Sequence, residues 1–337
     1  MIGILNVTVP FFALVGCGWL AARLALLPGQ AVPALNAFVL WFALPAMLLR
    51  FAAQTPFSTL ADPAVFGAYA LSGLFVLVLT LAGLRWAAGE GWRDAALGAL
   101  SASWSNWGYM GFALIPALLG PQALAALIAA GVADLLVVVS AALAVASREG
   151  RAPEPWWHAI SGAMAGVGRN PLVWAIAAGA LLSAVTGIRG DAALPPLLGG
   201  LVGLGDRLLA LLGTAAGPVA LFAMGAALHR PAAGNRMSSA APTSAATPLA
   251  LLTIVGTKLL VHPLATWTIA RHVFGLPHDA AAVLTLMAAL PAAGTAFLFA
   301  ERHGADAGRA ATAILVSTVA AFLTFPGFAA LLAQPAA

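Results

Sequence analysis

Three ionisable side chains lie inside long apolar stretches of this sequence, where a charge is costly. Asp134 is near the middle of the apolar run 122–146, and Lys258 and His262 are four residues apart in the run 249–274. A charge at the centre of a bilayer costs at least about 2.5–3.5 kcal/mol, so each residue is a candidate for function. Lys258 could attract an anion or take part in ion coupling. Alternatively, Asp134 and Lys258 form a structural ion pair without net charge.

His262 shares a helix face with Lys258, because residues four apart are neighbours on a helix. Its imidazole could serve as a proton relay. Because His262 directly precedes Pro263, it could instead satisfy a carbonyl group that the proline leaves free. The single cysteine, Cys17, excludes an internal disulfide and argues against a metal site built on cysteine. We therefore expect no metal.

Glycine, proline and small polar residues interrupt two further apolar runs, 95–118 and 279–300. Such breaks free backbone N–H and C=O groups, which can hold ions and anions near the middle of a membrane. A helix N-terminus also carries about half a positive charge, which favours an anion. Glycine and proline are, however, common in membrane helices generally. The candidate substrate-binding residues are Asn106, Gly108 and Gly111 in the first run and Pro291, Gly294 and Thr295 in the second.

The composition requires that these residues be positioned by helices in a membrane. Of the 337 residues, 62% are hydrophobic and 8% are charged, whereas soluble domains carry about 25% charged residues. Only helices or a closed barrel satisfy the backbone in lipid, and the long runs rich in Leu and Ala favour helices over the short alternating strands of a barrel. The pI is near 10.2, but the arginines are scattered through short loops, which argues against nucleic acid as a partner.

The apolar runs predict an all-α, polytopic membrane protein of ten spans. A span needs about 20 apolar residues, and the expected spans are 3–22, 32–51, 64–86, 95–118, 122–146, 170–187, 200–228, 249–274, 279–300 and 309–333. The charged loop 147–169 separates the repeats 1–146 and 170–337, and a flexible linker, 230–248, lies within the second. Five spans per repeat force the second repeat to enter the membrane inverted, and the interrupted spans are the fourth and the ninth.

Arginines set the expected orientation, because cytoplasmic loops carry more of them. With both termini outside, ten arginines lie at cytoplasmic ends and four at outer ends; Lys258 lies inside a span and is not counted. The cytoplasmic set is Arg23, Arg85, Arg93, Arg148, Arg151, Arg169, Arg230, Arg236, Arg302 and Arg309, and the outer set is Arg50, Arg189, Arg207 and Arg271. We expect a multi-pass protein of the plasma (inner) membrane.

Short motifs follow one another along nearly the whole chain. They are Leu35-Asn36-Ala37-Phe38-Val39, Phe42-Ala43-Leu44-Pro45-Ala46, Asn106-Trp107-Gly108-Tyr109-Met110-Gly111, Arg169-Asn170-Pro171-Leu172-Val173, Gly217-Pro218-Val219-Ala220-Leu221-Phe222-Ala223-Met224-Gly225, Lys258 with Pro263, and Pro291 with Phe297 and Ala300. This ordered series resembles the auxin efflux carrier family of ten-helix transporters, which includes bacterial malonate-type carriers and plant auxin exporters. The resemblance implies that Asn106 and a partner in the second repeat meet where two broken helices cross, and contact the substrate there.

The sequence departs from the family pattern at two positions. Phe112 follows Gly111 where the family usually has proline, and Thr295 stands where it often has asparagine. Thr295 keeps a polar side chain but lacks the second hydrogen-bonding arm of an amide. The substrate could therefore differ from those of better-known members.

These observations predict a secondary transporter or facilitator for a small organic anion, a mono- or dicarboxylate that is malonate-like or auxin-like, working by alternating access. We expect no enzyme activity and no cofactor, and coupling to a proton or to sodium is open. The partners are the anion, the lipid bilayer and, as an open alternative, a second copy of the chain. The alternative functions are a non-transporting membrane sensor and an intramembrane aspartyl protease.

The protease alternative rests on the motif Gly203-Leu204-Gly205-Asp206. Such enzymes need a second aspartate, preceded by tyrosine, and neither Tyr69 nor Tyr109 precedes one. Asp206 has Arg207 beside it, which predicts a solvated helix cap instead. The sequence has no Walker A motif, nucleophile elbow or HExxH motif, so it gives no support to ATP-driven transport or common hydrolases.

Overall fold

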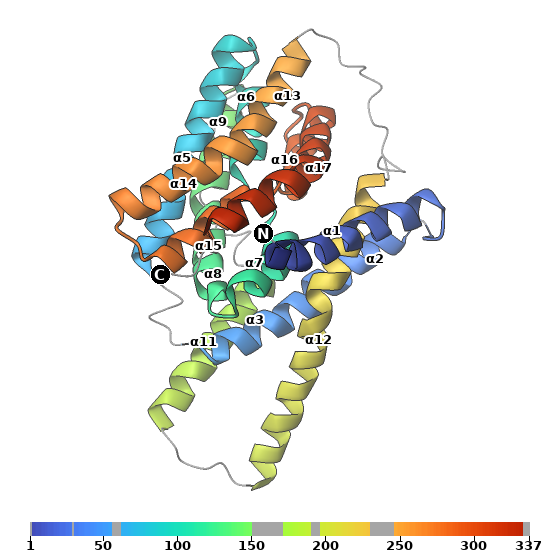
Figure 1. Ribbon diagram of the computed structural model, residues 1–337, viewed down its shortest axis with the longest axis vertical. Helices are drawn as coiled ribbons and strands as arrows, with labels where there is room; N and C mark the ends of the chain where they lie inside the picture. The colour runs from blue at the N-terminus through green and yellow to red at the C-terminus, as the bar shows by residue number, and fades with distance from the viewer. Residues whose placement is uncertain are drawn as a thin grey trace. The chain divides into compact units, whose positions relative to one another are not determined.

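The computed structural model describes residues 2–28, 30–55, 62–149, 171–189, 196–229 and 246–332. Within these ranges the chain is helical and has no β-strand (Figure 1). Most of the predicted loop 147–169 and of the predicted linker 230–248 lies outside the described residues. The chain divides into two compact units, and each unit takes helices from both halves of the sequence.

Unit 1 comprises Met1–Thr8, Pro63–Ala165 and Ala232–Ala337, and unit 2 comprises Val9–Asp62 and Gly166–Pro231. Unit 2 contains α1 (Ile2–Arg23) from Val9 onwards, α2 (Ala31–Phe38), η1 (Val39–Ala43), α3 (Leu44–Ala53), α11 (Pro171–Arg189) and α12 (Pro196–His229). Unit 1 contains α5 (Pro63–Ala82), η2 (Gly83–Ala87), α6 (Trp92–Ser103), η3 (Trp107–Gly111), α7 (Phe112–Leu119), α8 (Ala123–Ala133), η4 (Asp134–Val139), α9 (Ser140–Ala146), η5 (Ser147–Glu149), α13 (Ala246–Gly256), η6 (Thr257–Val261), α14 (His262–Thr268), η7 (Ile269–Val273), α15 (His278–Ala289), α16 (Thr295–Arg302) and α17 (Ala307–Leu332).

Seven helical stretches in the described part of the chain are long and apolar enough to cross a membrane. They are Gly3–Arg23, Ala31–Ala53, Pro63–Ala87, Ala123–Ala146, Val202–Leu228, Pro248–Val273 and Ala307–Leu332, which match seven of the ten predicted spans. The other three are shorter. Predicted spans 95–118 and 279–300 are each divided into two helices, and the apolar part of α11, Pro171–Ala184, is too short to be counted. The protein is therefore a multi-pass helical membrane protein, whereas the full ten-span inverted repeat stays a prediction.

The described residues contain six π turns, in which backbone N–H groups bond five residues back instead of four. Two of them hold the buried charges that the sequence singles out: Asp134 is the first residue of η4, and Lys258 is the second residue of η6. The π turns at η1, η2 and η7 lie in other spans, and η3 begins a helix directly after a break. The helices that carry Asp134 and Lys258 are thus irregular at those residues.

Two glycines let α1 and α12 approach backbone to backbone in unit 2. A Cβ atom on Gly225 would lie 1.9 Å from the carbonyl oxygen of Val15, and one on Gly18 would lie 2.0 Å from that of Phe222. No side chain fits at such distances. Small residues at helix crossings are the usual means of association in lipid, where burial of apolar surface gives no drive.

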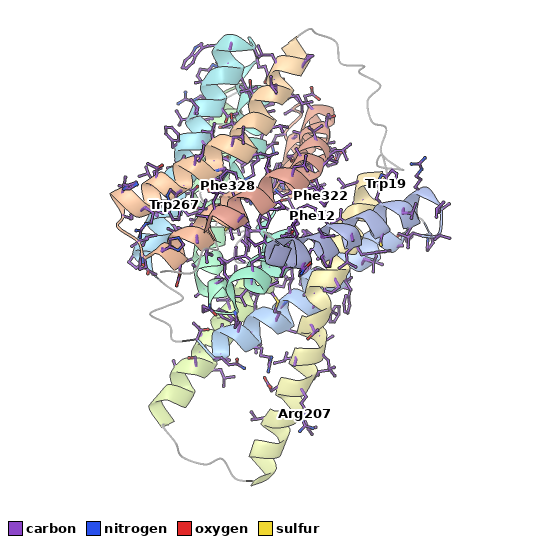
Figure 2. All side chains as sticks on the ribbon, viewed as in Figure 1. Phe12, Trp19, Arg207, Trp267, Phe322 and Phe328 are labelled. Atoms are coloured by element: carbon purple, nitrogen blue, oxygen red, sulfur yellow. The ribbon has the colours of Figure 1, made fainter. Side chains whose placement is uncertain are left out.

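Asp206 is solvated as predicted, with a side chain that is 47% exposed, but it does not cap a helix. It lies within α12, and both of its carboxylate oxygens accept hydrogen bonds from Arg50 of α3: Nε donates to Oδ1 at 2.7 Å and a terminal nitrogen donates to Oδ2 at 3.2 Å. Arg207 is exposed and projects from α12 (Figure 2). The local sequence gave no sign of this partner, which lies 156 positions away.

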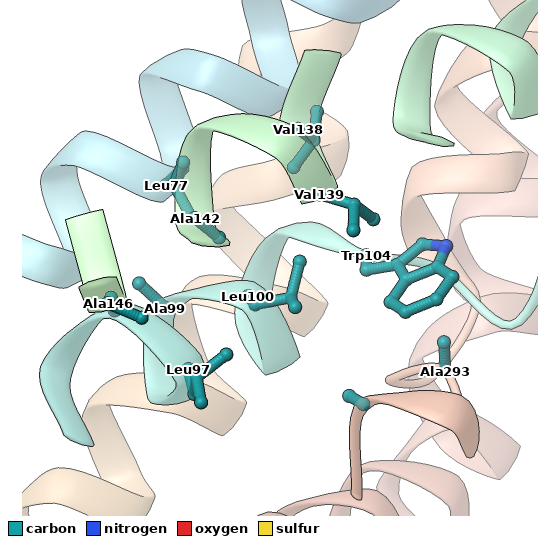
Figure 3. Close-up of a cluster of buried hydrophobic side chains, with 12 residues drawn as sticks. Leu77, Leu97, Ala99, Leu100, Trp104, Val138, Val139, Ala142, Ala146 and Ala293 are labelled. Atoms are coloured by element: carbon teal, nitrogen blue, oxygen red, sulfur yellow. The ribbon is translucent and has the colours of Figure 1, made fainter. Parts of the chain in front are cut away.

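Buried apolar side chains bring α5, α6 and α9 together in unit 1. Leu77, Leu100, Val138 and Ala142 pack in one buried cluster that continues to Trp104 at the end of α6 (Figure 3). The ring of Trp104 meets Phe299 of α16 edge to face, with centroids 5.5 Å apart. The end of α6 is therefore held between α9 and α16.

A buried ion pair joins two helix starts in unit 1. The Arg309 guanidinium, in the first turn of α17, donates to the Glu90 carboxylate before α6, and it also donates to the Asp94 carbonyl at 2.8 Å. The Asp94 carboxylate accepts the backbone N–H of Asp306 at 2.8 Å. The side chains of Arg309 and Glu90 are only 7% and 10% exposed. Burial raises the pKa of the Glu90 carboxyl above its ordinary value, while the charge of Arg309 opposes that rise.

Candidate functional site

The two interrupted segments meet inside unit 1. Helix α6 ends at Ser103 and helical turns resume at Trp107, while α15 ends at Ala289 and α16 begins at Thr295. The extended residues between these ends form an antiparallel bridge, Ser105 opposite Ala292. The Asn106 N–H donates to the Pro291 carbonyl at 2.9 Å, and the Ala293 N–H donates to the Trp104 carbonyl at 3.0 Å. The breaks lie where the sequence predicts interruptions, and they cross.

The local sequence explains why α15 stops. Leu290 precedes Pro291, and the residue before a proline is disfavoured in the helical region; its φ and ψ are −63° and 154°. At the other break Trp104 is also extended, with φ −95° and ψ 117°. The freed backbone groups bond across the bridge, and the Ala292 N–H is satisfied by the hydroxyl of Ser317 on α17 at 3.2 Å. The crossing is thus a built feature with paired backbone groups.

Four helix ends lie beside this bridge, which we call the crossing and define as residues 104–106 and 290–294. Two are N-termini, at Trp107 and at Thr295, and two are C-termini, at Ser103 and at Ala289. The N-terminal ends carry partial positive charge and unpaired N–H groups. Such ends can bind a carboxylate without a basic side chain.

Lys258 lies directly against the crossing and is completely buried. Its ammonium donates to the Ser105 hydroxyl at 2.6 Å and to the Ala288 carbonyl at 3.1 Å, and it lies 3.0 Å from Nδ1 of His262. An ammonium has three protons, so these three contacts satisfy it fully. The one lysine of the chain therefore places its positive charge beside the bridge residue Ser105, from a separate helix.

Asp134 is also fully buried, but it does not contact Lys258 directly. No ion pair joins them in the described part of the chain, and neither carboxylate oxygen has a hydrogen-bond partner there. The carboxylate lies close to the Ser105 backbone N–H and within the electrostatic reach of Lys258. The two charges are therefore not in direct contact, and the predicted pair, direct or bridged by water, stays a prediction in its water-bridged form; the Ser105 hydroxyl accepts from Lys258 and its N–H lies close to Asp134.

Sequence reasoning missed two polar members of this cluster, Ser105 and Tyr69. The Tyr69 hydroxyl lies 3.1 Å from the Ser105 hydroxyl, and its ring is 5.8 Å from that of His262. Ser105 stands next to Asn106 in an interrupted segment, which was a usable signal. Tyr69 is one of two tyrosines and lies in an apolar helix, where a buried hydroxyl needs a partner.

The predicted substrate-binding residues occupy different environments. Asn106 is 4% exposed and joins Pro291 through their backbones. A Cβ atom on Gly108 or Gly294 would have no neighbour within 4 Å, whereas one on Gly111 would lie 3.2 Å from the Leu290 side chain. Gly108 and Gly294 thus leave open space near the crossing, while Gly111 is packed against apolar atoms.

Thr295 is half-buried and is the first residue of α16, directly after Gly294. The crossing therefore brings Asn106, Pro291, Gly294 and Thr295 to one place in unit 1. Lys258 lies beside them because it donates to Ser105, and His262 contacts Lys258. Asp134 belongs to the same cluster through the Ser105 backbone.

Unit 2 has a separate apolar cavity of ≈ 370 Å³. It is open to one side and is lined by residues of the α2–α3 span, α11 and α12, including Trp41, Trp174 and Leu212. None of the predicted site residues lines it. Its walls offer hydrocarbon and aromatic surface and no charged group, so it lacks the chemistry that an anion requires.

Comparison with known proteins adds a consistent finding. The family model described as "Membrane transport protein" matches residues 4–155 and 157–329. The chain is also similar to a protein of Rhizobium meliloti (strain 1021) named "Putative malonate transporter". The two are 28% identical over 344 aligned positions, which cover 97% of this chain and 95% of the relative.

Proposed function

This chain belongs to the membrane transport protein family, and on that premise we propose that it is a secondary transporter or facilitator that moves a small organic anion by alternating access. The single observation that carries the proposal is the crossing itself. Two extended segments are bonded to each other within the apolar interior of unit 1, and the chain's one lysine donates to the bridge residue Ser105.

The arrangement of helices supports an inverted repeat of ten helices. Each half of the sequence gives its first two helical spans to unit 2 and its next three to unit 1. The break falls in the fourth helix of each half, after α5 in the first and after the α13–η7 span in the second. We propose residues 1–146 and 170–337 as the two repeats, joined by the loop 147–169. The two segments matched by the family model meet at residue 156, within that loop.

We assign substrate contact to Asn106, Gly108, Gly294 and Thr295. The two glycines leave room where side chains would stand, so a ligand can approach the backbone of both N-terminal helix ends. Asn106 supplies an amide at one end and Thr295 a hydroxyl at the other. Pro291 sets the break, and Gly111 holds the turn that follows Asn106.

The charge at the site supports a small carboxylate over other ligands. Lys258 provides one positive charge, and two helix N-termini add partial charges, which together match one or two carboxylate groups. A nucleotide or other polyanion would need more cationic groups than the cluster holds. The malonate named for the relative from Rhizobium meliloti is a small dicarboxylate of this class.

The protease alternative has less support than transport. Asp206 is engaged through both oxygens by Arg50, so it is held as one member of an ion pair. The function of a non-transporting sensor does not explain why two broken helices cross inside the protein.

Replacing Asn106 with alanine tests the substrate site. We expect uptake of radiolabelled malonate into proteoliposomes to lose about 10- to 100-fold in kcat/KM, because a hydrogen bond to a charged group contributes about 1.5–3 kcal/mol. Ser103→Ala is the matched control, since the Ser103 hydroxyl bonds to the Ala99 carbonyl of its own helix at 2.9 Å. Unchanged transport by Asn106→Ala would remove that side chain from the site. Selective transport of an uncharged or cationic solute by the wild type would overturn the anion assignment.

The arginine distribution supports an orientation with both termini outside. The test uses Cys17→Ala as background, so that a single cysteine introduced at Gly150 or Ala240 is the only thiol. In intact cells, a thiol reagent that cannot cross the membrane should leave both positions unlabelled, and it should label both after the membrane is opened. Labelling of either position from outside would reverse the orientation.

A further inference from the structure

We propose that transport of the anion is coupled to one proton, which binds the carboxylate of Asp134. This inference rests on the proposed function and deepens it, because it names the coupling ion and the residue that holds it. The geometry that carries it is a fully buried carboxylate whose oxygens have no hydrogen-bond partner among the described residues, close to the Ser105 N–H, together with a buried ammonium that donates to the Ser105 hydroxyl at the crossing.

Asp134 is poorly satisfied as an anion. It is 0% exposed, and both of its oxygens lack a hydrogen-bond partner within the described residues. An ionised carboxylate that is buried without donors is among the costliest arrangements in a protein interior. Addition of a proton removes that charge. A native residue kept in such a place is a candidate for reversible proton binding.

Lys258 is satisfied differently, by neutral groups. Its three protons meet the Ser105 hydroxyl, the Ala288 carbonyl and Nδ1 of His262. None of these acceptors neutralises the ammonium, so its charge is available to an anion. An ammonium can only donate, so with Lys258 charged Nδ1 is the acceptor and the neutral His262 ring carries its proton on Nε2; His262 then serves to position Lys258.

One positive charge therefore faces two potential counter-ions. While Asp134 is ionised, its charge cancels that of Lys258 and an anion at the crossing gains little. When a proton forms an O–H bond on Asp134, the charge of Lys258 becomes available to the substrate. Binding of the proton and of the anion must then favour each other by the same factor.

The cycle balances in atoms and charge. A proton adds to one oxygen of Asp134 from the compartment that supplies the anion. After the site has opened to the other side, the anion leaves and the O–H bond breaks, which releases the proton there. No electrons are transferred, and a monovalent anion crosses with its charge neutralised.

The surroundings of Asp134 favour a proton over sodium. Sodium requires a shell of several oxygen ligands, whereas the Ser105 N–H and the Lys258 ammonium that act on this carboxylate are a donor and a cation, and the Tyr69 hydroxyl adds one oxygen within its electrostatic reach. Helices α5, α6, α8 and α9 pack against η4. Among them only Tyr69 of α5 brings a titratable group to the cluster, since Arg93 and Asp94 lie at the far end of α6, roughly 16 Å along its axis from Ser105.

Proton uptake on substrate binding tests the inference directly. Purified full-length protein in weakly buffered detergent solution is mixed with malonate, and a pH indicator reports protons taken up. Above the pH at which free Asp134 is protonated, we expect close to one proton per bound malonate, and malonate affinity should weaken about tenfold per pH unit. Asp134→Asn should show no uptake and an affinity independent of pH, because an amide cannot bind the proton. Asp279→Asn, which removes an exposed carboxylate of unit 1, should behave as wild type.

Each other outcome decides against the coupling or against the function. Malonate binding by the wild type without proton uptake and without pH dependence overturns the coupling and leaves the transport function standing. Proton uptake that persists in Asp134→Asn places the proton elsewhere and also overturns the assignment. If Asp134→Asn does not fold, the wild type still decides, through accumulation of malonate driven by a pH gradient in proteoliposomes and its loss with a protonophore. A wild type that neither binds nor transports any carboxylate contradicts the proposed function itself.

Discussion

Replacement of Lys258 with methionine should reduce transport of small carboxylates by about 30- to 1000-fold. At an effective dielectric constant of about 20, a unit charge roughly 4–8 Å from the substrate contributes about 2–4 kcal/mol, and each 1.36 kcal/mol is about tenfold in rate or affinity. Methionine fills a similar volume without charge. The measurement is the initial rate of malonate uptake into proteoliposomes over a range of concentrations, so that KM and kcat are separated.

Three further variants separate lost charge from lost fold. Lys258→Met leaves Asp134 as an uncompensated buried acid, so the double variant Lys258→Met/Asp134→Asn should regain thermal stability while transport stays low. Lys258→Arg keeps the charge and should retain part of the activity. Leu260→Met, at a 52% exposed position of the same π turn, controls for the methionine. Full activity in Lys258→Met would exclude the ammonium from anion recognition.

Arg309→Ala should destabilise the protein by about 3–5 kcal/mol, because it leaves the Glu90 carboxylate buried without its cation. It also removes the donor to the Asp94 carbonyl, which is part of the link between α6 and α17. Unfolding in mixed micelles, followed by circular dichroism, gives the free energy. Arg302→Ala, which removes an exposed arginine of unit 1, should cost less than about 0.5 kcal/mol.

The cost of Arg309→Ala should grow with pH. The charge and hydrogen bond of Arg309 hold the Glu90 pKa down against burial, so in the variant the folded-state pKa rises further above the ordinary value of 4.5. A carboxyl group with a raised folded-state pKa stabilises the fold below its unfolded pKa, and this contribution is lost as pH rises through the folded value. The loss should therefore be smaller at pH 5 than at pH 8. The double variant Glu90→Gln/Arg309→Met should remove the pH dependence, and an equal loss at both pH values would contradict this account.

The membrane helices and one of the helix breaks could be predicted from the sequence, because they depend on composition and on local residue types. Long apolar runs required membrane helices, and Pro291 with its neighbours marked a real interruption, because proline excludes the preceding residue from a helix. The equivalent break at Trp104 to Asn106 was found only because it stood at the matching place in the first half. Spans 95–118 and 279–300 were predicted to be interrupted, but the residues at which each helix stops and resumes were not, since apolar length alone does not reveal where a helix changes direction.

Partners distant in sequence could not be predicted in the same way. Arg50 and Asp206 come from separate halves, and no local pattern connects them. For Asp134 and Lys258 the sequence predicted a pair, either direct or bridged by water, because each charge alone is costly in lipid. In the structure they are not in direct contact, and Lys258 donates instead to the Ser105 hydroxyl; a short hydroxyl side chain in an apolar run gave little reason to expect that role.

The π turns at Asp134 and Lys258 bear on how the lengths of related sequences should be compared. A π turn contains one residue more than the α turn that it replaces, so it has the form of a single-residue insertion absorbed within a membrane helix. In a regular helix such an insertion would rotate every later side chain by about 100° and shift it by about 1.5 Å. Here the extra residue is confined to η4 and η6, so the helix beyond keeps its packing. When relatives that lack these turns are aligned with this chain, they should therefore show a one-residue deletion at 134–139 or 257–261. Such a deletion lies inside a membrane span, where sequence alignments normally contain no gap. A gap at either place would mark the loss of the buried charge from its present position.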